Sequence, residues 1–272
     1  MAKKERLDTY LVKLGKFDST ERAKAAILEG RILVNGECVD KAGTLIAPST
    51  EVSVKEKDEE FVSRGGIKLK RALEVFRIDV KDAVVLDVGA STGGFTDCLL
   101  KKGASFVMAV DVGYGQLAWP LRNDPKVLVL ERTNIRHLTS DKLPILADLV
   151  VIDISFISVK KVIDNIKRLA SSDAKYLILI KPQFEVDKKY VEKKGIVRNP
   201  KTHSKVLMDV WRDFEERCFK VEGLTFSPIL GAKGNMEFFF YLRAGKEKIK
   251  DDSFVAKIDE LVSSAHNALL RD

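Results

Sequence analysis

The chain has few of the residues that build metal sites and disulfide frameworks. Its 272 residues include only three cysteines and three histidines. Cys38, Cys98 and Cys218 are an odd number and lie far apart in the sequence, which is typical of reduced thiols. Neither residue type shows the spacing of metal ligands. We therefore expect no disulfide framework and no bound metal ion.

Long hydrophobic runs are also missing. No apolar stretch approaches the roughly 20 residues that a membrane-spanning helix needs. The longest runs, such as Leu149–Ile152 and Tyr176–Ile180, have the length of buried strands. The N-terminal segment MAKKERLDTY has no apolar core of the kind found in secretory signal peptides. These absences predict a cytoplasmic protein without membrane insertion, and they weigh against a membrane-lytic activity.

The composition is that of a soluble globular protein with a basic balance. Hydrophobic residues make up 45% of the chain and charged residues 32%, and the net charge is +7. Such a charge is compatible with a polyanionic partner. The length suffices for one large and one small domain. A charged connector, KEKDEEFV at residues 55–62, separates them, so we predict domains at residues 1–60 and 61–272.

The segment Val84–Thr96, VVLDVGASTGGFT, is the most informative part of the chain. An apolar run ends at Asp87, a glycine-rich turn follows, and a helix is expected to begin there. Glycines at such a turn allow a ligand to approach the backbone closely. A second strand, Phe106–Val110, ends at Asp111, which is placed to accept hydrogen bonds from ribose hydroxyls. The unit therefore predicts a cofactor that carries a nucleoside.

The order of the glycines indicates which cofactor this is. A dinucleotide fold requires G-x-G-x-x-G, which sets the pyrophosphate on the helix N-terminus. Here the order is G-x-x-x-G-G, and Ala90 stands where the second glycine belongs. The pattern D-x-G-x-x-x-G-G is the first motif of methyltransferases that use S-adenosyl-L-methionine. A nicotinamide cofactor is the weaker alternative.

Strands and helices alternate along the rest of the chain, as in a doubly wound α/β sheet. The last two predicted strands are expected to form an antiparallel hairpin, and the tail helix is expected to dock on the core. Strands are predicted at 84–88, 106–111, 127–130, 148–153, 175–181, 219–227 and 236–243. Helices are predicted at 94–102, 158–170, 201–217 and 252–269. The predicted fold is a Rossmann-like sheet of about seven strands with a small N-terminal α+β domain.

Four polar residues stand at or beside ends of the predicted sheet. Asp153 ends the strand LVVID, Lys181 ends YLILI, Glu237 lies in the last hairpin, and Lys68 opens the helix before the sheet. Ligands of open α/β sheets bind at the carboxyl ends of the strands. A ribose 2′-hydroxyl is a poor nucleophile that must lose its proton, and a lysine held by carboxylates suits this task without a metal. This set predicts ribose methylation.

The N-terminal segment resembles the S4 type of RNA-binding domain. The resemblance rests on the strings RLDTYLVKLGKF and ERAKAAILEGRILVNGECVD, in which an Asn35-Gly36 turn marks a hairpin. Domains of this type set basic residues against RNA phosphates. The candidates for RNA contact in this chain are Arg6, Lys13, Arg22, Lys24, Arg31, Arg64 and Arg198.

The set of two lysines and two acids around the glycine turn resembles the FtsJ-type ribose 2′-O-methyltransferases. The strings GASTGGFT, VDVGYGQL, DISFIS, KPQFE and KGNMEFF resemble the TlyA family along nearly the whole chain. This resemblance implies an enzyme that methylates cytidine ribose in ribosomal RNA or ribosomal subunits. It implies Lys68, Asp153, Lys181 and Glu237 as catalytic residues, with Lys181 as the base.

The same resemblance assigns the cofactor pocket and leaves two rival functions. The residues implied for S-adenosyl-L-methionine are Asp87, Gly89, Ala90, Ser91, Gly93, Phe95, Thr96, Asp111, Val112, Tyr114 and Asn134. Members of the family are often called hemolysins, so a membrane-lytic protein is one rival. A non-catalytic RNA-binding assembly factor is the other. No oligomeric state is implied.

Overall fold

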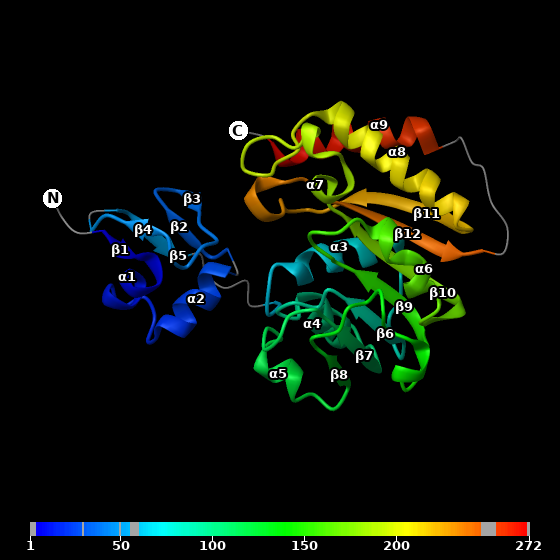
Figure 1. Ribbon diagram of the computed structural model, residues 1–272, viewed down its shortest axis with the longest axis horizontal. Helices are drawn as coiled ribbons and strands as arrows, with labels where there is room; N and C mark the ends of the chain where they lie inside the picture. The colour runs from blue at the N-terminus through cyan, green and yellow to red at the C-terminus, as the bar shows by residue number, and fades with distance from the viewer. Residues whose placement is uncertain (1–3, 29, 49, 55–59, 246–253, 271–272) are drawn as a thin grey trace. The chain divides into compact units, whose positions relative to one another are not determined.

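The computed structural model shows two compact units, Met1–Glu60 and Phe61–Asp272 (Figure 1). It describes residues 4–28, 30–48, 50–54, 60–245 and 254–270. Each unit has its own apolar core, so each is described by itself.

The small unit packs two helices against short strands. β2 is the central strand of a three-stranded sheet with the order β3-β2-β5, and β1 pairs with β4. Asn35 and Gly36 have φ angles of 51° and 80°, the backbone that a tight two-residue hairpin requires. Leu7, Leu11 and Ile27 are fully buried in its core. The elements are β1 (Glu5–Arg6), α1 (Leu7–Lys13), α2 (Thr20–Leu28), β2 (Ile32–Val34), β3 (Glu37–Cys38), β4 (Leu45–Ile46) and β5 (Val52–Val54).

The large unit is built on a seven-stranded sheet with the order β11-β12-β10-β9-β6-β7-β8. The strands from β8 to β10 are parallel, and β12 runs antiparallel to both β10 and β11. This sheet confirms the predicted α/β class and the final hairpin. The strands are β6 (Val84–Val88), β7 (Phe106–Val110), β8 (Val127–Leu130), β9 (Ala147–Ile152), β10 (Ala170–Ile180), β11 (Phe219–Phe226) and β12 (Phe238–Ala244).

Helices cover both faces of this sheet because successive strand residues point to opposite sides. Val85 packs in one core with α3 and α4, and its neighbour Leu86 packs in the other with α6, α8 and α9. α8 and α9 run side by side (Figure 1). The helices are α3 (Gly65–Phe76), α4 (Gly94–Lys101), α5 (Trp119–Arg122), α6 (Ile163–Lys167), α7 (Pro182–Glu185), α8 (Pro200–Glu216) and α9 (Phe254–Leu269), with the 3₁₀ turns η1 (Ser140–Lys142), η2 (Val159–Lys161), η3 (Lys188–Tyr190) and η4 (Ala232–Gly234).

Two helix predictions have different outcomes. The tail helix docks as predicted, because Ile258, Val262 and Ala265 are buried in the core that α8 also lines. The predicted helix at 158–170 is wrong: it is split into η2 and α6, and the chain has already entered β10 at Ala170. Ala170 pairs with Ala147 of β9, and this sheet contact ends the helix early. In the part of the chain that the structure describes, no helix is both long and apolar enough to cross a bilayer.

The order in which successive strands are added to the sheet reverses beside β6. The chain runs outward from β6 through β7 to β8, then returns to place β9 on the other side of β6. In open α/β sheets, ligands bind in the crevice at such a reversal, outside the carboxyl ends of the strands. The fold therefore points to the ends of β6 and β9 as the place to look for a site.

Candidate active site

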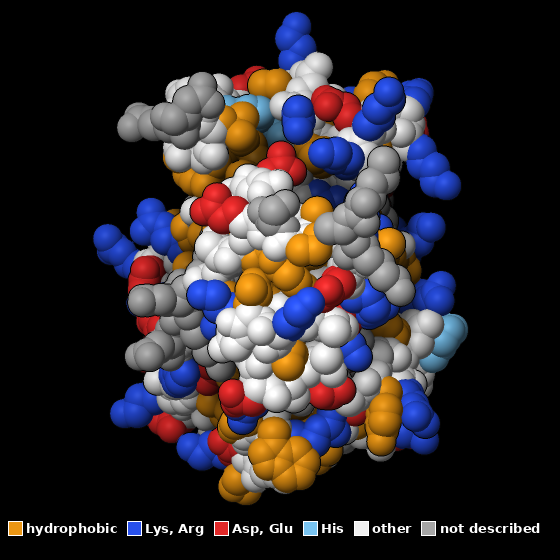
Figure 2. Space-filling view, turned by 90° about the vertical axis from the view of Figure 1, so that its left-hand side faces the viewer, with side chains coloured by type: hydrophobic (Ala, Val, Ile, Leu, Met, Phe, Trp, Pro, Cys, Tyr) orange, Lys and Arg blue, Asp and Glu red, His pale blue; other side chains and the backbone are white. Residues whose placement is uncertain are grey.

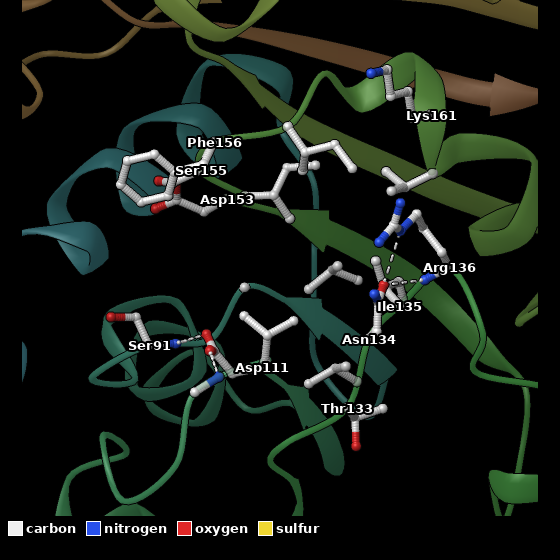
Figure 3. Close-up of a pocket in the computed structure, with 18 of the residues that line it drawn as sticks. Ser91, Asp111, Thr133, Asn134, Ile135, Arg136, Asp153, Ser155, Phe156 and Lys161 are labelled. Atoms are coloured by element: carbon white, nitrogen blue, oxygen red, sulfur yellow. Dashed lines mark hydrogen bonds between the residues drawn. The ribbon is translucent and has the colours of Figure 1, made fainter. Parts of the chain in front are cut away.

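A pocket of about 730 Å³ opens at this place (Figure 3). Its size is within the range of about 300–1,000 Å³ that is usual for small-molecule sites. The wall is formed by residues that follow β6, β7, β8 and β9. They include Val88, Gly89, Ser91, Asp111, Val112, Gly113, Gln116, Thr133, Asn134, Ile135, Arg136, Asp153, Ser155, Phe156 and Lys161.

The glycine turn after β6 lies directly against the segment that follows β9. A Cβ added to Gly89 would lie 2.6 Å from the carbonyl oxygen of Asp153, and the φ angle of Gly89 is +86°. The backbone N–H of Asp153 donates a hydrogen bond to the carbonyl of Val88 at 2.9 Å. A side chain at position 89 has no room, so glycine is needed to hold the two strand ends together.

Asp111 holds two loops with its carboxylate. Its oxygens accept hydrogen bonds from the backbone N–H of Ser91 at 2.8 Å and of Gly113 at 2.7 Å (Figure 3). A carboxylate has about four acceptor positions, so Asp111 retains capacity for two hydroxyl groups. This arrangement fits the predicted contact with a ribose, and it makes Asp111 a structural part of the pocket before any ligand binds.

Asp87 was expected in the pocket wall, but it lies behind that wall. Its side chain is fully buried, and one oxygen accepts a hydrogen bond from the Thr96 hydroxyl at 2.6 Å. Among the described residues, no hydrogen-bond donor reaches the other oxygen, Oδ1. Burial raises the pKa of Asp87 to about 7, although the Thr96 hydrogen bond opposes this rise. Ala90, Gly93 and Phe95 likewise support the turn and are absent from the wall.

The remaining residues expected at the cofactor lie at the outer part of the pocket. Val112 and Asn134 belong to its wall. Tyr114 does not, and its exposed ring lies 4.0 Å from the guanidinium carbon of Arg132. That distance is typical of a cation–π contact.

The structure brings the four predicted catalytic residues together as two ion pairs. Lys181 Nζ lies 2.5 Å from Asp153 Oδ1, and Lys68 Nζ lies 2.6 Å from Glu237 Oε2. The Lys68–Glu237 pair is the more enclosed, with side chains that are 11% and 2% exposed. A Cβ at Gly231 would lie 2.0 Å from Glu237 Oε1. Glycine at this position therefore leaves the space that Glu237 occupies.

The charges of the two pairs act on each other. Burial lowers the pKa of Lys68, but the negative charges of Glu237 and Asp153 outweigh it and the net pKa is raised. Burial raises the pKa of Asp153, but the positive charges of Lys181 and Lys68 outweigh it and the net pKa is lowered. At neutral pH the site therefore holds Lys68 as an ammonium ion and Asp153 as a carboxylate.

The sequence did not indicate several residues of the pocket wall. The loop after β9 contributes Ser155, whose hydroxyl accepts a hydrogen bond from Lys181 Nζ at 2.9 Å. It also contributes Phe156, which is 90% exposed and has a φ angle of +68°, an unusual backbone for a bulky residue. Arg136 and Lys161 add two cations to the wall. The string DISFIS was the only signal for this loop, and it identified Asp153 alone.

The RNA-contact candidates of the small unit have acidic partners. Arg6 pairs with Asp8, Lys13 with Glu5, and Arg22 with Asp18, at 2.6, 2.7 and 2.6 Å. The basic side chains are 54%, 62% and 71% exposed. The Lys13 and Arg22 pairs are exposed and contribute little to stability, so these cations remain available to exchange a carboxylate for a phosphate, whereas Arg6 is held by the buried carboxylate of Asp8. Lys24 is also exposed, and Arg31 is half-buried.

The large unit carries its own basic loop, which we define as residues 188–205, from η3 to the first turns of α8. It includes the exposed residues Lys188, Lys189, Lys193, Lys194, Arg198, Lys201 and Lys205. Asn235 holds this loop by accepting a hydrogen bond from Val197 N–H and donating one to the Gly195 carbonyl, both at 3.0 Å. Arg64, the other candidate on this unit, is half-buried. Figure 2 shows Lys and Arg side chains spread over one face of the molecule, with Asp and Glu among them.

Two known families match this chain. The FtsJ-like methyltransferase family matches residues 61–244, and the S4 domain matches residues 5–52. The chain is 42% identical over 270 residues to "Putative rRNA methyltransferase YqxC" of Bacillus subtilis, covering 98% of this chain and 96% of the relative. It is 43% identical over 249 residues to the 16S/23S rRNA (cytidine-2'-O)-methyltransferase TlyA of Mycobacterium tuberculosis, covering 91% and 93%.

A solved structure extends the similarity to the whole fold. "Putative hemolysin from Streptococcus thermophilus" matches with a TM-score of 0.77 and 39% sequence identity, covering 98% of each chain. The match includes both units, so the similarity extends beyond the methyltransferase sheet. The resemblance that the sequence motifs indicated is thereby confirmed at the level of the family.

Proposed function

Because the chain belongs to the TlyA family of FtsJ-like methyltransferases, we propose that it uses S-adenosyl-L-methionine to methylate the 2′-hydroxyl of a cytidine in ribosomal RNA. The observation that carries the proposal is the pair of contacts Lys181–Asp153 and Lys68–Glu237 beside a pocket at the chain reversal. The target nucleoside comes from the relatives, one of which is a cytidine-2'-O-methyltransferase by name.

The pocket residues fit S-adenosyl-L-methionine. Asp111 has acceptor capacity left for ribose hydroxyls, and Gly89 leaves its backbone open where a side chain would collide with Asp153. Val112 and Asn134 would flank the adenine. When bound, the cofactor supplies a methyl group activated by a positively charged sulfur. The ends of β6 and β9 bring this part of the pocket next to Asp153, which lies in both the pocket wall and the catalytic set.

The two lysines have different roles in this proposal. Lys181 contacts Asp153 and Ser155, both in the pocket wall, and in its neutral form, after releasing its own proton to solvent, it accepts the proton of the 2′-hydroxyl as a general base. A positioned base contributes roughly 10²–10⁴-fold in rate. Lys68 keeps its proton because its pKa is raised, so it stabilises the negative charge on Asp153 and on the attacking oxygen. Asp153 holds the amine of Lys181 in place.

Both units contribute basic residues toward RNA. The small unit offers Arg6, Lys13, Arg22, Lys24 and Arg31, and the large unit offers Arg64 and the basic loop with Arg198. Phosphate contacts by such residues release counterions, so affinity falls steeply with salt. The S4 match supports RNA as the partner of the small unit.

The catalytic contacts favour an enzyme over the two rival functions. A non-catalytic assembly factor would not require two ion pairs assembled from α3, the ends of β9 and β10, and the final hairpin. The name hemolysin belongs to the structural relative from S. thermophilus. The pocket and the two ion pairs instead suit a nucleoside site with a proton acceptor.

The proposal is tested by methyl transfer to ribosomal particles. The protein is incubated with radiolabelled S-adenosyl-L-methionine and separately with free ribosomal RNA, small subunits, large subunits and assembled ribosomes. A 2′-O-methyl group blocks alkaline cleavage at its own nucleotide, so hydrolysis ladders locate it and distinguish ribose from base methylation. Lys181→Ala is the control for contaminating activity. Label absent from all substrates, or label on a base, would contradict the proposal.

A further inference from the structure

Ser155 connects the pocket to the candidate base. Its hydroxyl oxygen accepts a hydrogen bond from Lys181 Nζ at 2.9 Å, and the residue belongs to the pocket wall. It lies outside the two ion pairs and was not among the residues expected from the sequence. In Figure 3 it lies beside Asp153, the other residue that Lys181 contacts.

The loop that carries Ser155 is held at both ends. At its start, the Asp153 N–H donates to the Val88 carbonyl at 2.9 Å. At its end, the carboxylate of Glu185 accepts hydrogen bonds from the Ser158 hydroxyl at 2.5 Å and from the Val159 N–H at 2.8 Å. Glu185 belongs to α7, which begins directly after Lys181. The segment that carries Lys181 therefore also fixes the loop that carries Ser155.

This arrangement controls the direction of the lone pair on Lys181. A lysine acting as a base is a neutral amine with two N–H bonds and one lone pair in a tetrahedral arrangement. Nζ forms an ion pair with Asp153 Oδ1 at 2.5 Å and donates a hydrogen bond to the Ser155 hydroxyl at 2.9 Å. With one N–H bond directed at Ser155 and the amine held beside the carboxylate of Asp153, the direction of the lone pair is restricted.

We propose that Ser155 is a positioning residue that turns the lone pair of Lys181 toward the substrate hydroxyl. The inference rests on the function proposed above. In the step, the proton of the 2′-hydroxyl moves to Nζ while its oxygen forms a bond to the methyl carbon. The electron pair of the broken carbon–sulfur bond stays on sulfur. Ser155 exchanges no proton, so its contribution is orientation of the amine alone.

The kinetic test uses two substitutions of Ser155 and one distant control. Ser155→Ala removes the acceptor, and we expect the single-turnover rate to fall about tenfold, the effect of losing one hydrogen bond to a charged or polar partner. The affinities for RNA and S-adenosyl-L-methionine should not change. Ser155→Thr keeps the hydroxyl and should stay within about threefold of the wild type. Ser105→Ala removes a hydroxyl at the opposite end of β7 and should have no effect.

A spectroscopic test does not depend on activity. Hydrogen-bonded lysine side-chain protons exchange slowly with water, so ¹⁵N-lysine labelling makes them observable by NMR, and Lys181→Arg assigns the signal. We expect Ser155→Ala to broaden or remove this signal and Ser155→Thr to retain it. An unchanged signal in Ser155→Ala would overturn the inference even if the wild type methylates no RNA tested.

The kinetic outcomes separate the two proposals. An active wild type with an equally fast Ser155→Ala variant contradicts the role of Ser155 and leaves the methyltransferase proposal intact. A slow Ser155→Thr variant with unchanged affinities also contradicts it, because the hydroxyl would then be insufficient. An inactive wild type contradicts the proposed function, and the NMR signal then decides the role of Ser155.

Discussion

The buried carboxyl of Asp87 should make the stability of the large unit depend on pH. Its pKa of about 7 in the folded protein lies above the ordinary value of 3.8, because burial disfavours the charged form. The folded state therefore binds this proton more tightly than the unfolded state does. Stability falls as the pH rises from about 4 to about 7 and levels off above that range.

The size of this effect follows from the two pKa values. At a pH above both, the difference between 3.8 and about 7 corresponds to about 4 kcal/mol of lost stability. Near pH 5 the loss is about 2 kcal/mol, because the folded carboxyl is still protonated. Asp87→Asn removes the titration and keeps a side-chain oxygen for the Thr96 hydroxyl. The stability of the variant relative to wild type should thus rise by about 2–3 kcal/mol between about pH 5 and pH 8.

Urea unfolding followed by tryptophan fluorescence measures this difference. Both tryptophans, Trp119 and Trp211, lie in the large unit, so the signal reports that unit. Asp259→Asn, an exposed acid on α9, serves as the control and should follow the wild type at each pH. If Asp87→Asn and the wild type show parallel stability curves across this range, Asp87 is ionised in the folded protein and the reasoning from its burial fails.

Three further results are expected. Lys181→Ala should lower the single-turnover methylation rate by at least about 100-fold with little change in binding. Lys181→Arg should not restore the rate, because a guanidinium stays protonated. A near-normal rate for the arginine variant would contradict the role of Lys181 as the base. Asp111→Ala should weaken S-adenosyl-L-methionine binding by about 1–3 kcal/mol in calorimetry, and a preference for NAD in the same titration would contradict the cofactor assignment. Removal of residues 1–60 should leave a unit that binds cofactor and methylates poorly, whereas a full rate would show that the small unit is dispensable.

The positions of two of the proposed catalytic residues were predictable because these residues follow strand ends. Asp153 and Lys181 come directly after apolar runs, and the carboxyl ends of neighbouring parallel strands meet at one edge. The glycine order likewise depends on local backbone requirements, as the lack of space for a Cβ at Gly89 shows. The sequence also placed Asn35 and Gly36 in a hairpin, because few residues adopt that backbone.

Other features depend on contacts between distant segments and escaped prediction. The helix expected at 158–170 ends early because Ala170 pairs with Ala147. The local pattern of hydrophobic residues cannot predict a pairing between two distant segments. Ser155 contacts Lys181, which is 26 residues further along the chain, and the loop that carries Ser155 is held by Glu185. Asp87 is a different case. Its side chain points to the opposite face of the sheet from that of Val88, toward α4, where it contacts Thr96. The alternation of side chains along a strand was sufficient to predict this orientation.

The ion-pair distances do not distinguish the two lysines, since Lys68 and Lys181 lie 2.6 and 2.5 Å from their carboxylates. Their other neighbours do. Glu237, the partner of Lys68, is 2% exposed and fills the space left by Gly231, whereas Asp153, the partner of Lys181, is 19% exposed. Lys181 instead contacts two residues of the pocket wall, Asp153 and Ser155. We therefore expect a hydroxyl in the pocket to approach Lys181, and Lys68 to act on it through its positive charge.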